Sequence, residues 1–221
     1  MRSKISENIS NFLSEIEVLS VNRLPDVALP QLIAASKTRS AEEIEAAFHA
    51  GVSEFGENRV QEMVEKWPAI IQTHPKTRLH FIGQLQTNKV AEVVRYCDMV
   101  HTLDRPKLAT ALNEEAAKQS KIQSCLIQVN TGEEPQKGGA LPRDFEELLS
   151  YCRALEHLSI EGLMCVPPSD EPAGPHFALL QKMSRDYGLP YLSMGMSSDY
   201  QEAIRFGASA IRIGTGIFGP R

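Results

Sequence analysis

Eight short apolar runs, each typical of a buried strand, alternate along this chain with segments whose apolar residues recur at helical spacing. Strict alternation of strands and helices predicts a parallel sheet with helices outside it. A count of about eight such units predicts a closed (β/α)8 TIM-like barrel rather than an open sheet. The predicted strands cover residues 32–36, 54–58, 79–83, 99–103, 125–130, 160–166, 191–195 and 210–214.

The chain has 221 residues, a length that suits one large domain better than two. We therefore expect residues 1–221 to form a single-domain α/β barrel with no separate β-domain after it. Residues 131–141 and 167–175 are expected to be loops within the barrel. Pro68 is expected to help terminate the helix that follows the second strand, because proline cannot donate a helical hydrogen bond.

The segment before the barrel pattern has apolar residues at helical spacing, which predicts an extra amino-terminal helix packed on the domain. Acidic residues interrupt the segment, so it does not resemble a signal peptide. No stretch of the chain approaches the length of a membrane span. The apolar positions of the predicted helix are Ile5, Ile9, Phe12, Ile16 and Leu19.

Composition is ordinary for a soluble globular protein, with 42% hydrophobic and 23% charged residues. The net charge is −5 and the basic residues are scattered, so no nucleic-acid or anionic-membrane partner is expected. The four cysteines form no CxxC pair, and Cys125 and Cys165 lie in apolar runs, which favours reduced thiols in a cytoplasmic protein. The six histidines show no metal-ligand spacing, so no metal site is predicted.

Lys37 closes the first apolar run, which reads Leu32-Ile33-Ala34-Ala35-Ser36-Lys37-Thr38. A lysine at the carboxyl end of a parallel strand can point into a binding face. There a desolvated amine can lose its proton and attack a carbonyl carbon to form a Schiff base. The common alternative for any single lysine at a strand end is that its side chain simply reaches solvent.

Two strand ends late in the chain are rich in glycine and hydroxyl side chains, namely residues 193–198 and 212–216. Glycines let backbone N–H groups approach phosphate oxygens, and Ser and Thr hydroxyls add donors. Barrels of this kind usually hold phosphate in the loops after strands seven and eight, so we predict a phosphate site there. Ser197 or Ser198 is also expected to cap the helix that starts near Asp199.

The first and last strands are neighbours in a closed barrel, so a reactive Lys37 would lie beside this phosphate site. A phosphorylated aldehyde needs both features, and pyridoxal 5′-phosphate is the commonest such cofactor. Arg212 can point into the barrel mouth, where a guanidinium, which only donates, would keep the pyridine nitrogen unprotonated. A salt bridge with a carboxylate at the edge of the core is the alternative for Arg212.

Two further polar residues have alternative roles. Asn58 could hydrogen-bond the phenolic oxygen of the cofactor, or it could cap the second helix. His80 lies in the third predicted strand and is more typical of a satisfied core histidine than of a catalyst.

Seven motifs follow one another over nearly the whole chain. They cover residues 35–38, 55–62, 80–89, 126–130, 162–164, 193–199 and 212–219. The set resembles the pyridoxal phosphate homeostasis proteins, the family of the bacterial YggS proteins and the eukaryotic proline-synthetase co-transcribed homologues. The resemblance implies the barrel fold of alanine racemase, fold type III of the pyridoxal-phosphate proteins, without the C-terminal β-domain.

The resemblance also implies an internal aldimine on Lys37, phosphate contacts from Ser197, Gly214 and Thr215, and Arg212 at the ring nitrogen. Members of the family are thought to buffer or carry the cofactor and to affect vitamin B6 and amino-acid balance without robust catalysis. We therefore expect a monomeric cofactor-binding barrel that exchanges pyridoxal phosphate with client apo-enzymes.

Two enzyme hypotheses are the alternatives. A pyridoxal-phosphate-dependent amino-acid racemase would need a second acid or base opposite the cofactor. Tyr191 and Tyr200 flank the seventh strand and are the candidates for that role. A cofactor-free Schiff-base aldolase would need another lysine or carboxylate inside the barrel, and the sequence offers no good candidate.

Overall fold

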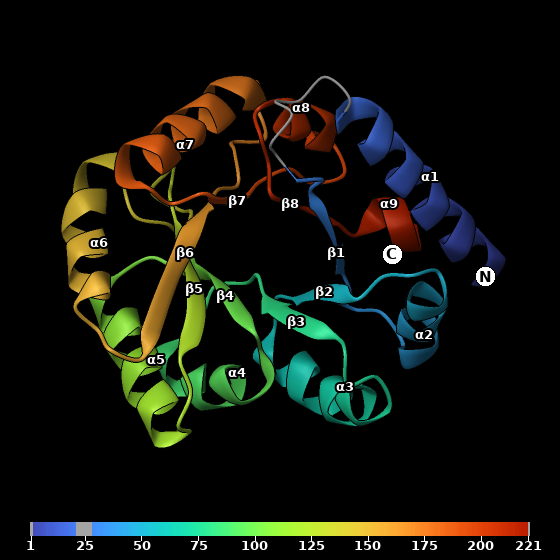
Figure 1. Cartoon of the computed structure of the whole chain (residues 1–221), viewed down its shortest axis with the longest axis horizontal. Coiled ribbons are helices and arrows are strands. Elements are labelled where there is room, and N and C mark those ends of the chain that lie inside the picture. The colour runs from blue at the N-terminus through green and yellow to red at the C-terminus, as the bar shows by residue number, and fades with distance from the viewer. Residues whose placement is uncertain (1, 21–27, 221) are drawn as a thin grey trace.

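The computed structural model describes residues 2–20 and 28–220 of the chain. Eight parallel strands among these residues form a closed barrel in sequence order, and Figure 1 shows the helices arranged around it. The predicted (β/α)8 barrel is therefore confirmed. The strands are β1 (Gln31–Ala35), β2 (Glu54–Glu57), β3 (Arg78–Phe81), β4 (Met99–Leu103), β5 (Gln123–Gln128), β6 (Leu158–Met164), β7 (Tyr191–Ser193) and β8 (Ala210–Ile213).

Helices connect the strands on the outside of the barrel. Two short 3-10 helices, η1 (Thr87–Lys89) and η2 (Pro142–Asp144), precede α4 and α6. A four-residue helix directly after β8, α9, is not predicted by the apolar pattern. The helices are α1 (Arg2–Ser20), α2 (Ala41–His49), α3 (Val60–Thr73), α4 (Val90–Tyr96), α5 (Pro106–Lys118), α6 (Phe145–Arg153), α7 (Ala173–Tyr187), α8 (Tyr200–Arg205) and α9 (Thr215–Phe218).

The amino-terminal helix α1 packs on the outside of the barrel, as predicted. Its apolar side is buried at Ile5, Ile9 and Ile16. It contacts α2, α8 and α9, and Figure 1 shows it beside these helices. Asn8 Nδ2 also donates a hydrogen bond to the carbonyl oxygen of Ile217 at 2.8 Å. The helix therefore covers the segment after β8, which carries part of the predicted site.

Two separate groups of apolar side chains fill the molecule. The larger core lies between the sheet and the helices and includes Phe55 and Trp67, neither of which is exposed. A smaller cluster consists of Met99, Leu126 and Met164. Because successive side chains of a strand point to opposite faces, this cluster lies on the inner face of the barrel.

Pro68 does not terminate the helix that follows β2. The helix α3 continues through it to Thr73. Proline removes one hydrogen bond from the helix interior, but Met63, Trp67 and Ile70 are buried on both sides of it. Tertiary packing of this apolar face stabilises the helix beyond the proline.

All four cysteines are free and buried, which confirms their interpretation as unpaired thiols. Burial raises the pKa of the Cys152 and Cys165 thiols to about 12, so both stay protonated at neutral pH. Within residues 2–20 and 28–220, no helix has the length and apolarity needed to cross a membrane. The same residues contain no group of three His, Cys, Asp or Glu side chains arranged to hold a metal ion.

Candidate functional site

Lys37, Asn58 and Gly214 each follow a strand at the carboxyl edge of the barrel. The strand β1 pairs with β2 on one side and with β8 on the other, so these three positions converge although they are far apart in sequence. Gly214 passes so close to β1 that an added Cβ would lie 3.4 Å from the carbonyl oxygen of Ala35. The barrel therefore brings together three of the residues predicted for the site.

Lys37 is half-buried and lies in the turn between β1 and α2. The next residue, Thr38, has a left-handed backbone with a φ of 63°, which is uncommon for a β-branched side chain. Strain of this kind persists only where the surroundings fix the backbone, and it concentrates at functional sites. Contacts from α3 and from the segment after β8 fix this turn.

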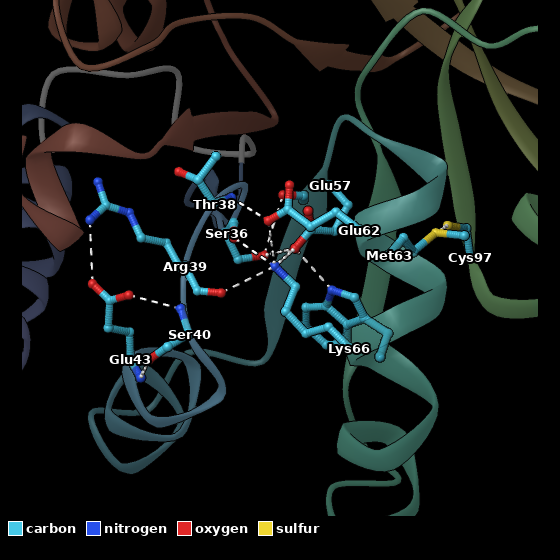
Figure 2. Close-up of polar contacts among 12 residues, drawn as sticks. Ser36, Thr38, Arg39, Ser40, Glu43, Glu57, Glu62, Met63, Lys66 and Cys97 are labelled. Atoms are coloured by element: carbon cyan, nitrogen blue, oxygen red, sulfur yellow. Dashed lines mark hydrogen bonds and ion pairs between the residues drawn. The ribbon is translucent and has the colours of Figure 1, made fainter. Parts of the chain in front are cut away.

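Lys66 of α3 binds the backbone of the turn at two points. Its Nζ donates to the carbonyl oxygen of Ser36 at 2.9 Å and to that of Arg39 at 3.4 Å. Glu62, one helical turn earlier, pairs with Lys66 at 3.0 Å and accepts a hydrogen bond from the backbone N–H of Thr38. Figure 2 shows these contacts converging on the turn, which is thereby anchored to α3.

Glu57, the last residue of β2, is a carboxylate with no exposed surface. Its Oε1 accepts hydrogen bonds from Ser36 Oγ at 2.7 Å and from Trp67 Nε1 at 3.0 Å, and it pairs with Lys66 Nζ at 2.7 Å. Its Oε2 has no hydrogen-bond partner among the described residues. A buried carboxylate requires a cation and donors of this kind. Glu57 therefore joins the ends of β1 and β2 to α3 (Figure 2).

Arg39 ties the same turn to the chain after β8. Its guanidinium donates to the carbonyl oxygens of Gly219 at 2.6 Å and Phe218 at 3.4 Å, and it pairs with Glu43 at 3.3 Å. Glu43 also forms a capping box with Ser40 at the start of α2. The turn, the start of α2 and the end of α9 are consequently held in one arrangement.

The loops after β7 and β8 lie against each other, as the predicted phosphate site requires. The backbone N–H of Gly216 donates to Ser197 Oγ at 3.4 Å. Ser197 and Thr215 are both exposed, so their hydroxyls are accessible to a ligand. Gly195 has a φ of +93°, and a Cβ added there would lie 2.6 Å from the Cβ of Ala203. Only glycine fits this turn without displacing α8.

The predicted serine cap of α8 is wrong. Asp199 is the N-cap residue of this helix, and its Oδ1 accepts a hydrogen bond from the N–H of Met196 at 2.5 Å. The Asp199 carboxylate closes the turn before the helix, so Ser197 and Ser198 remain exposed in the loop.

The side-chain oxygen of Asn58 is buried and has no hydrogen-bond partner among the described residues. The N-cap of α3 is Arg59, and no side chain caps this helix. The alternative that Asn58 caps the second helix is therefore wrong. A buried polar atom normally has a partner, and a ligand at the strand ends can supply one here.

Arg212 is 5% exposed. Its NH1 donates to Ser193 Oγ at 2.6 Å and its NH2 donates to the carbonyl oxygen of Cys165 at 2.9 Å. In the part of the chain that the structure describes, the arginines that form ion pairs are Arg39, Arg105 and Arg143. Arg212 forms none there, so the salt-bridge alternative is wrong. Burial lowers the pKa of Arg212, and the neighbouring Cys165, Asp199 and Tyr191 oppose this shift.

His80 has no exposed surface, and both of its ring nitrogens are hydrogen-bonded. Nε2 lies 2.6 Å from Glu54 Oε2, and Nδ1 lies 2.9 Å from His101 Nε2. This confirms the interpretation of His80 as a satisfied core histidine.

Tyr191 and Tyr200 are both engaged away from the converging strand ends. Tyr191 is the first residue of β7, and its hydroxyl donates to Gln31 Oε1, at the start of β1, at 2.6 Å. Tyr200 donates to Glu15 of α1 at 2.6 Å, outside the barrel. Neither hydroxyl is therefore directed at the edge where Lys37 lies.

A cavity of about 740 Å³ opens beside the loops after β6 and β7. Its lining includes Val166, Met196, Ser198 and Asp199. A volume of this size is typical of small-molecule sites. The cavity flanks Ser197, so open space adjoins the predicted phosphate site.

The residues that hold the Lys37 turn were not predicted from the sequence. Glu62 and Lys66 have the i,i+4 spacing of a helical ion pair, but most such pairs lie on exposed helix surfaces. Glu57 was the stronger signal, because a carboxylate inside an apolar strand requires a buried partner. Glu54 and His101 gave the same kind of signal and were also missed, since each is a polar residue in a predicted strand.

Residues 22–221 match the family model of the alanine racemase N-terminal domain. Several curated relatives of this chain carry the name pyridoxal phosphate homeostasis protein. The relative from Aquifex aeolicus is 40% identical over 200 residues, which cover 86% of this chain and 87% of that protein. The relative from Vibrio cholerae is 40% identical over 231 residues, which cover 100% of this chain and 98% of that protein.

Solved structures show the same fold. PipY of Synechococcus elongatus, solved with pyridoxal phosphate bound, is 33% identical with a TM-score of 0.84, covering 97% of this chain and 100% of that one. Alanine racemase from Corynebacterium glutamicum is 14% identical with a TM-score of 0.72, covering 100% of this chain and 61% of that one. The racemase likeness shows that the barrel fold is shared, as predicted from the sequence.

Proposed function

The chain belongs to the family of the pyridoxal phosphate homeostasis proteins, and we propose from this that it binds pyridoxal 5′-phosphate and takes part in vitamin B6 and amino-acid homeostasis. The observation that carries the proposal is a half-buried lysine after β1 that is flanked on the two neighbouring strands by an amide oxygen without a partner among the described residues and by a buried guanidinium. These groups fit the cofactor, which presents an aldehyde, a phenolic oxygen and a ring nitrogen to its site.

The proposed covalent link joins Nζ of Lys37 to the aldehyde carbon of the cofactor. The amine attacks the carbonyl, and one water molecule is released as the imine forms. Lys66 and Glu62 support this role because they hold the backbone on both sides of Lys37. An amine carried on a fixed turn loses less conformational entropy when it binds.

Other residues hold the cofactor in this proposal. Arg212 donates to the lone pair of the ring nitrogen and keeps that nitrogen unprotonated, because a guanidinium cannot accept a hydrogen bond from a protonated ring nitrogen. Asn58 accepts a hydrogen bond from the phenolic hydroxyl through its side-chain oxygen. Ser197, Gly214 and Thr215 bind the phosphate through hydroxyl and backbone N–H donors.

A carrier fits this site better than a racemase. Racemisation requires an acid or base on each face of the cofactor. The hydroxyls of Tyr191 and Tyr200 are occupied by Gln31 and Glu15 instead. An unprotonated ring nitrogen also weakens the cofactor as an electron sink. We therefore propose that the protein holds the cofactor without robust catalysis of its own.

The cavity beside Ser197 supports an exchangeable cofactor, since it leaves the predicted phosphate site open on one side. We propose that the protein is a monomer and that it transfers the cofactor to client apo-enzymes. Light scattering during size-exclusion chromatography measures the mass of the protein in solution and so tests the monomer. Reactivation of a pyridoxal-phosphate-dependent apo-enzyme, with the carrier kept behind a dialysis membrane as a control, distinguishes direct transfer from release into solution.

The cofactor assignment is tested by the visible spectrum of the purified protein incubated with pyridoxal phosphate. The wild type should be yellow, and Lys37→Ala should be colourless. Lys107→Ala, which removes an exposed lysine from α5, is the matched control and should remain yellow. Borohydride reduction followed by peptide mass spectrometry should locate the pyridoxyl group on Lys37. A pyridoxyl group on another lysine would overturn the assignment.

The carrier assignment has its own test. D- and L-amino acids are added separately to the yellow protein, and the enantiomers are followed by chiral chromatography. We expect no turnover beyond that of free pyridoxal phosphate. Sustained racemisation that Lys37→Ala abolishes would identify an enzyme instead.

A further inference from the structure

Five polar side chains cross the interior of the barrel in an unbroken series of hydrogen bonds, which we call the interior network. Arg212 NH1 donates to Ser193 Oγ at 2.6 Å, and Ser193 Oγ lies 2.9 Å from His101 Nδ1. His101 Nε2 lies 2.9 Å from His80 Nδ1, and His80 Nε2 lies 2.6 Å from Glu54 Oε2. These residues come from β8, β7, β4, β3 and β2, so the network spans the barrel rather than following one strand pair.

When both histidines are neutral, the Glu54 carboxylate and the Arg212 guanidinium together fix the direction of every bond in the interior network. A guanidinium only donates, so Ser193 Oγ accepts from it. The Ser193 hydroxyl then donates to His101 Nδ1, which is its other partner within hydrogen-bond distance. His101 must carry its proton on Nε2 and donate to His80 Nδ1. His80 in turn carries its proton on Nε2 and donates to the Glu54 carboxylate.

With this direction, all four hydrogen bonds are satisfied with both histidines neutral. The reverse direction would require Glu54 to donate to His80 Nε2, which an ionised carboxylate cannot do. A charged His101 would leave the Ser193 hydroxyl without its acceptor and would put two cations side by side in the barrel. The interior network therefore has one cation at the Arg212 end, one anion at the Glu54 end, and neutral groups between them.

We propose that Ser193, His101 and His80 are positioning residues that orient the Arg212 guanidinium toward the cofactor ring by coupling it to the Glu54 carboxylate. The proposal rests on the proposed function for the identity of the ligand. Ser193 is the central element, because its oxygen accepts from Arg212 while its proton is donated to His101. No residue of the interior network other than Arg212 needs to touch the cofactor.

The electrostatics of the barrel agree with a neutral His101 ring. The pKa of His101 lies well below its usual range, first because the ring is buried and then because His80 and Arg212 lie nearby. The carboxylate of Glu54 is 14% exposed, so the anionic end of the network has access to solvent. Other titratable groups that face Arg212 or its neighbour Tyr191 are Arg78, Glu161, Cys165 and Asp199.

Nitrogen-15 NMR of the histidine-labelled protein tests the proposal without any cofactor. Long-range correlation spectra distinguish the two neutral tautomers from the imidazolium form. His80 and His101, assigned with His80→Gln and His101→Gln, should both be neutral Nε2–H tautomers at about pH 7. Glu54→Gln should keep this pattern, since its amide oxygen can still accept from His80. An imidazolium form or an Nδ1–H tautomer at His101 in the wild type would overturn the proposal.

The second test removes the Ser193 hydroxyl. Ser193→Ala should weaken cofactor binding about tenfold, because a hydrogen bond to a charged group is lost. It should also shift the resonance of pyridoxal phosphate labelled with nitrogen-15 in the ring, whereas Ser193→Thr, which keeps a hydroxyl, should restore both values. Ser124→Ala is the matched control, because it removes a half-buried hydroxyl on β5 that binds Glu161 outside the interior network.

The two tests separate this proposal from the function itself. If the wild type forms no coloured complex, the proposed function fails while the tautomer result still decides the interior network. If the wild type is yellow and Ser193→Ala binds the cofactor with an unchanged affinity and ring resonance, the positioning role is wrong and the carrier function stands. Thermal unfolding of each variant shows whether a loss of binding reflects a loss of fold.

Discussion

Lys66 Nζ lies 2.7 Å from Oε1 of Glu57, a carboxylate with no exposed surface, and the same amine binds the backbone beside Lys37. The Lys66 side chain is only 11% exposed. Taking two such charges out of water is costly, and their mutual attraction compensates only when both are present. The pair therefore joins the stability of the barrel to the geometry of the Lys37 turn, and this link can be tested by substitution.

Lys66→Met should destabilise the protein by about 3–5 kcal/mol, because it leaves the Glu57 carboxylate buried without its cation. Urea unfolding measures this change. The double variant Glu57→Gln with Lys66→Met should recover part of the loss, since the unpaired charge is removed as well.

A surface ion pair supplies the matched control for this substitution. Lys118 pairs with Glu115 at 3.3 Å while 69% exposed, so Lys118→Met should change stability by about 0.5 kcal/mol or less. If Lys66→Met destabilises the protein no more than Lys118→Met does, the buried pair does not hold the turn.

Thr38→Gly should stabilise the protein slightly and weaken its hold on the cofactor. The left-handed backbone at Thr38 costs about 1–2 kcal/mol for an ordinary residue, and glycine removes this strain at an entropic cost of about 0.5–1 kcal/mol. The more flexible turn then loses the fixed orientation of Lys37. Equilibrium unfolding and cofactor titration measure the two effects.

Ser120→Gly is the control for Thr38→Gly, because Ser120 also has a positive φ, of 53°, but lies in the turn after α5. It should change stability in the same direction without changing cofactor affinity. A Thr38→Gly variant that binds the cofactor as well as the wild type would show that the strained turn has no role in binding.

His101 should make the protein less stable in mild acid. Because its pKa is lowered in the folded protein, the unfolded chain takes up a proton below about pH 6.5 that the folded chain refuses. Stability should then fall by about 1.4 kcal/mol per pH unit for this group until the pH reaches the folded pKa. Above about pH 6.5 His101 is neutral in both the folded and the unfolded chain, so its contribution to the pH dependence of stability vanishes.

Urea unfolding between neutral and mildly acidic pH measures this slope, and His101→Gln should make it shallower. The same substitution at His49, whose side chain is 70% exposed, provides the comparison for this slope. An identical slope in His101→Gln and the wild type would mean that His101 is protonated in the folded protein.

The cysteines should be unreactive toward thiol reagents in the native protein. All four are buried, and burial raises the pKa of Cys152 and Cys165 to about 12, so almost no thiolate is available to react. Titration with a chromogenic disulfide should detect no rapidly reacting thiol before denaturation and four after it. Ser150→Cys, at an exposed position of α6, should add one rapid equivalent and so verifies the assay.

The barrel could be predicted from the sequence because apolar alternation records which residues are buried. The same signal places strand ends too late, as at Val129 and Asn130 after β5. Val129 is 1% exposed and reads as strand, but Asn130 N–H donates to the carbonyl of Ala140 in the following loop rather than to a neighbouring strand. Burial continues beyond the sheet at this edge, since the loops that follow the strands fold over it.

The candidate site was only partly predictable for a related reason. Lys37 and Arg212 could be assigned to neighbouring strands from the strand order alone, because β1 and β8 must be neighbours in a closed barrel. The contact between His101 and Ser193 joins residues 92 positions apart across the barrel, and no local pattern records it. Strand order predicts which residues share an edge, whereas side-chain networks depend on how far each side chain reaches across the interior.

Gly83→Ala should disrupt the site through Asn58 without touching any cofactor-binding side chain. A Cβ at Gly83 would lie 2.1 Å from the carbonyl oxygen of Asn58, so the backbone after β2 must move. Overpacking of this kind costs about 1–3 kcal/mol, and the displaced Asn58 should lower cofactor affinity as well.

Gly188→Ala is the matched control for Gly83→Ala, because Gly188 caps α7 with a φ of 66° and a Cβ there meets nothing within 4 Å. It should lower stability by about 1 kcal/mol through backbone strain and leave binding intact. Equal cofactor affinity in the two variants would remove Asn58 from the site.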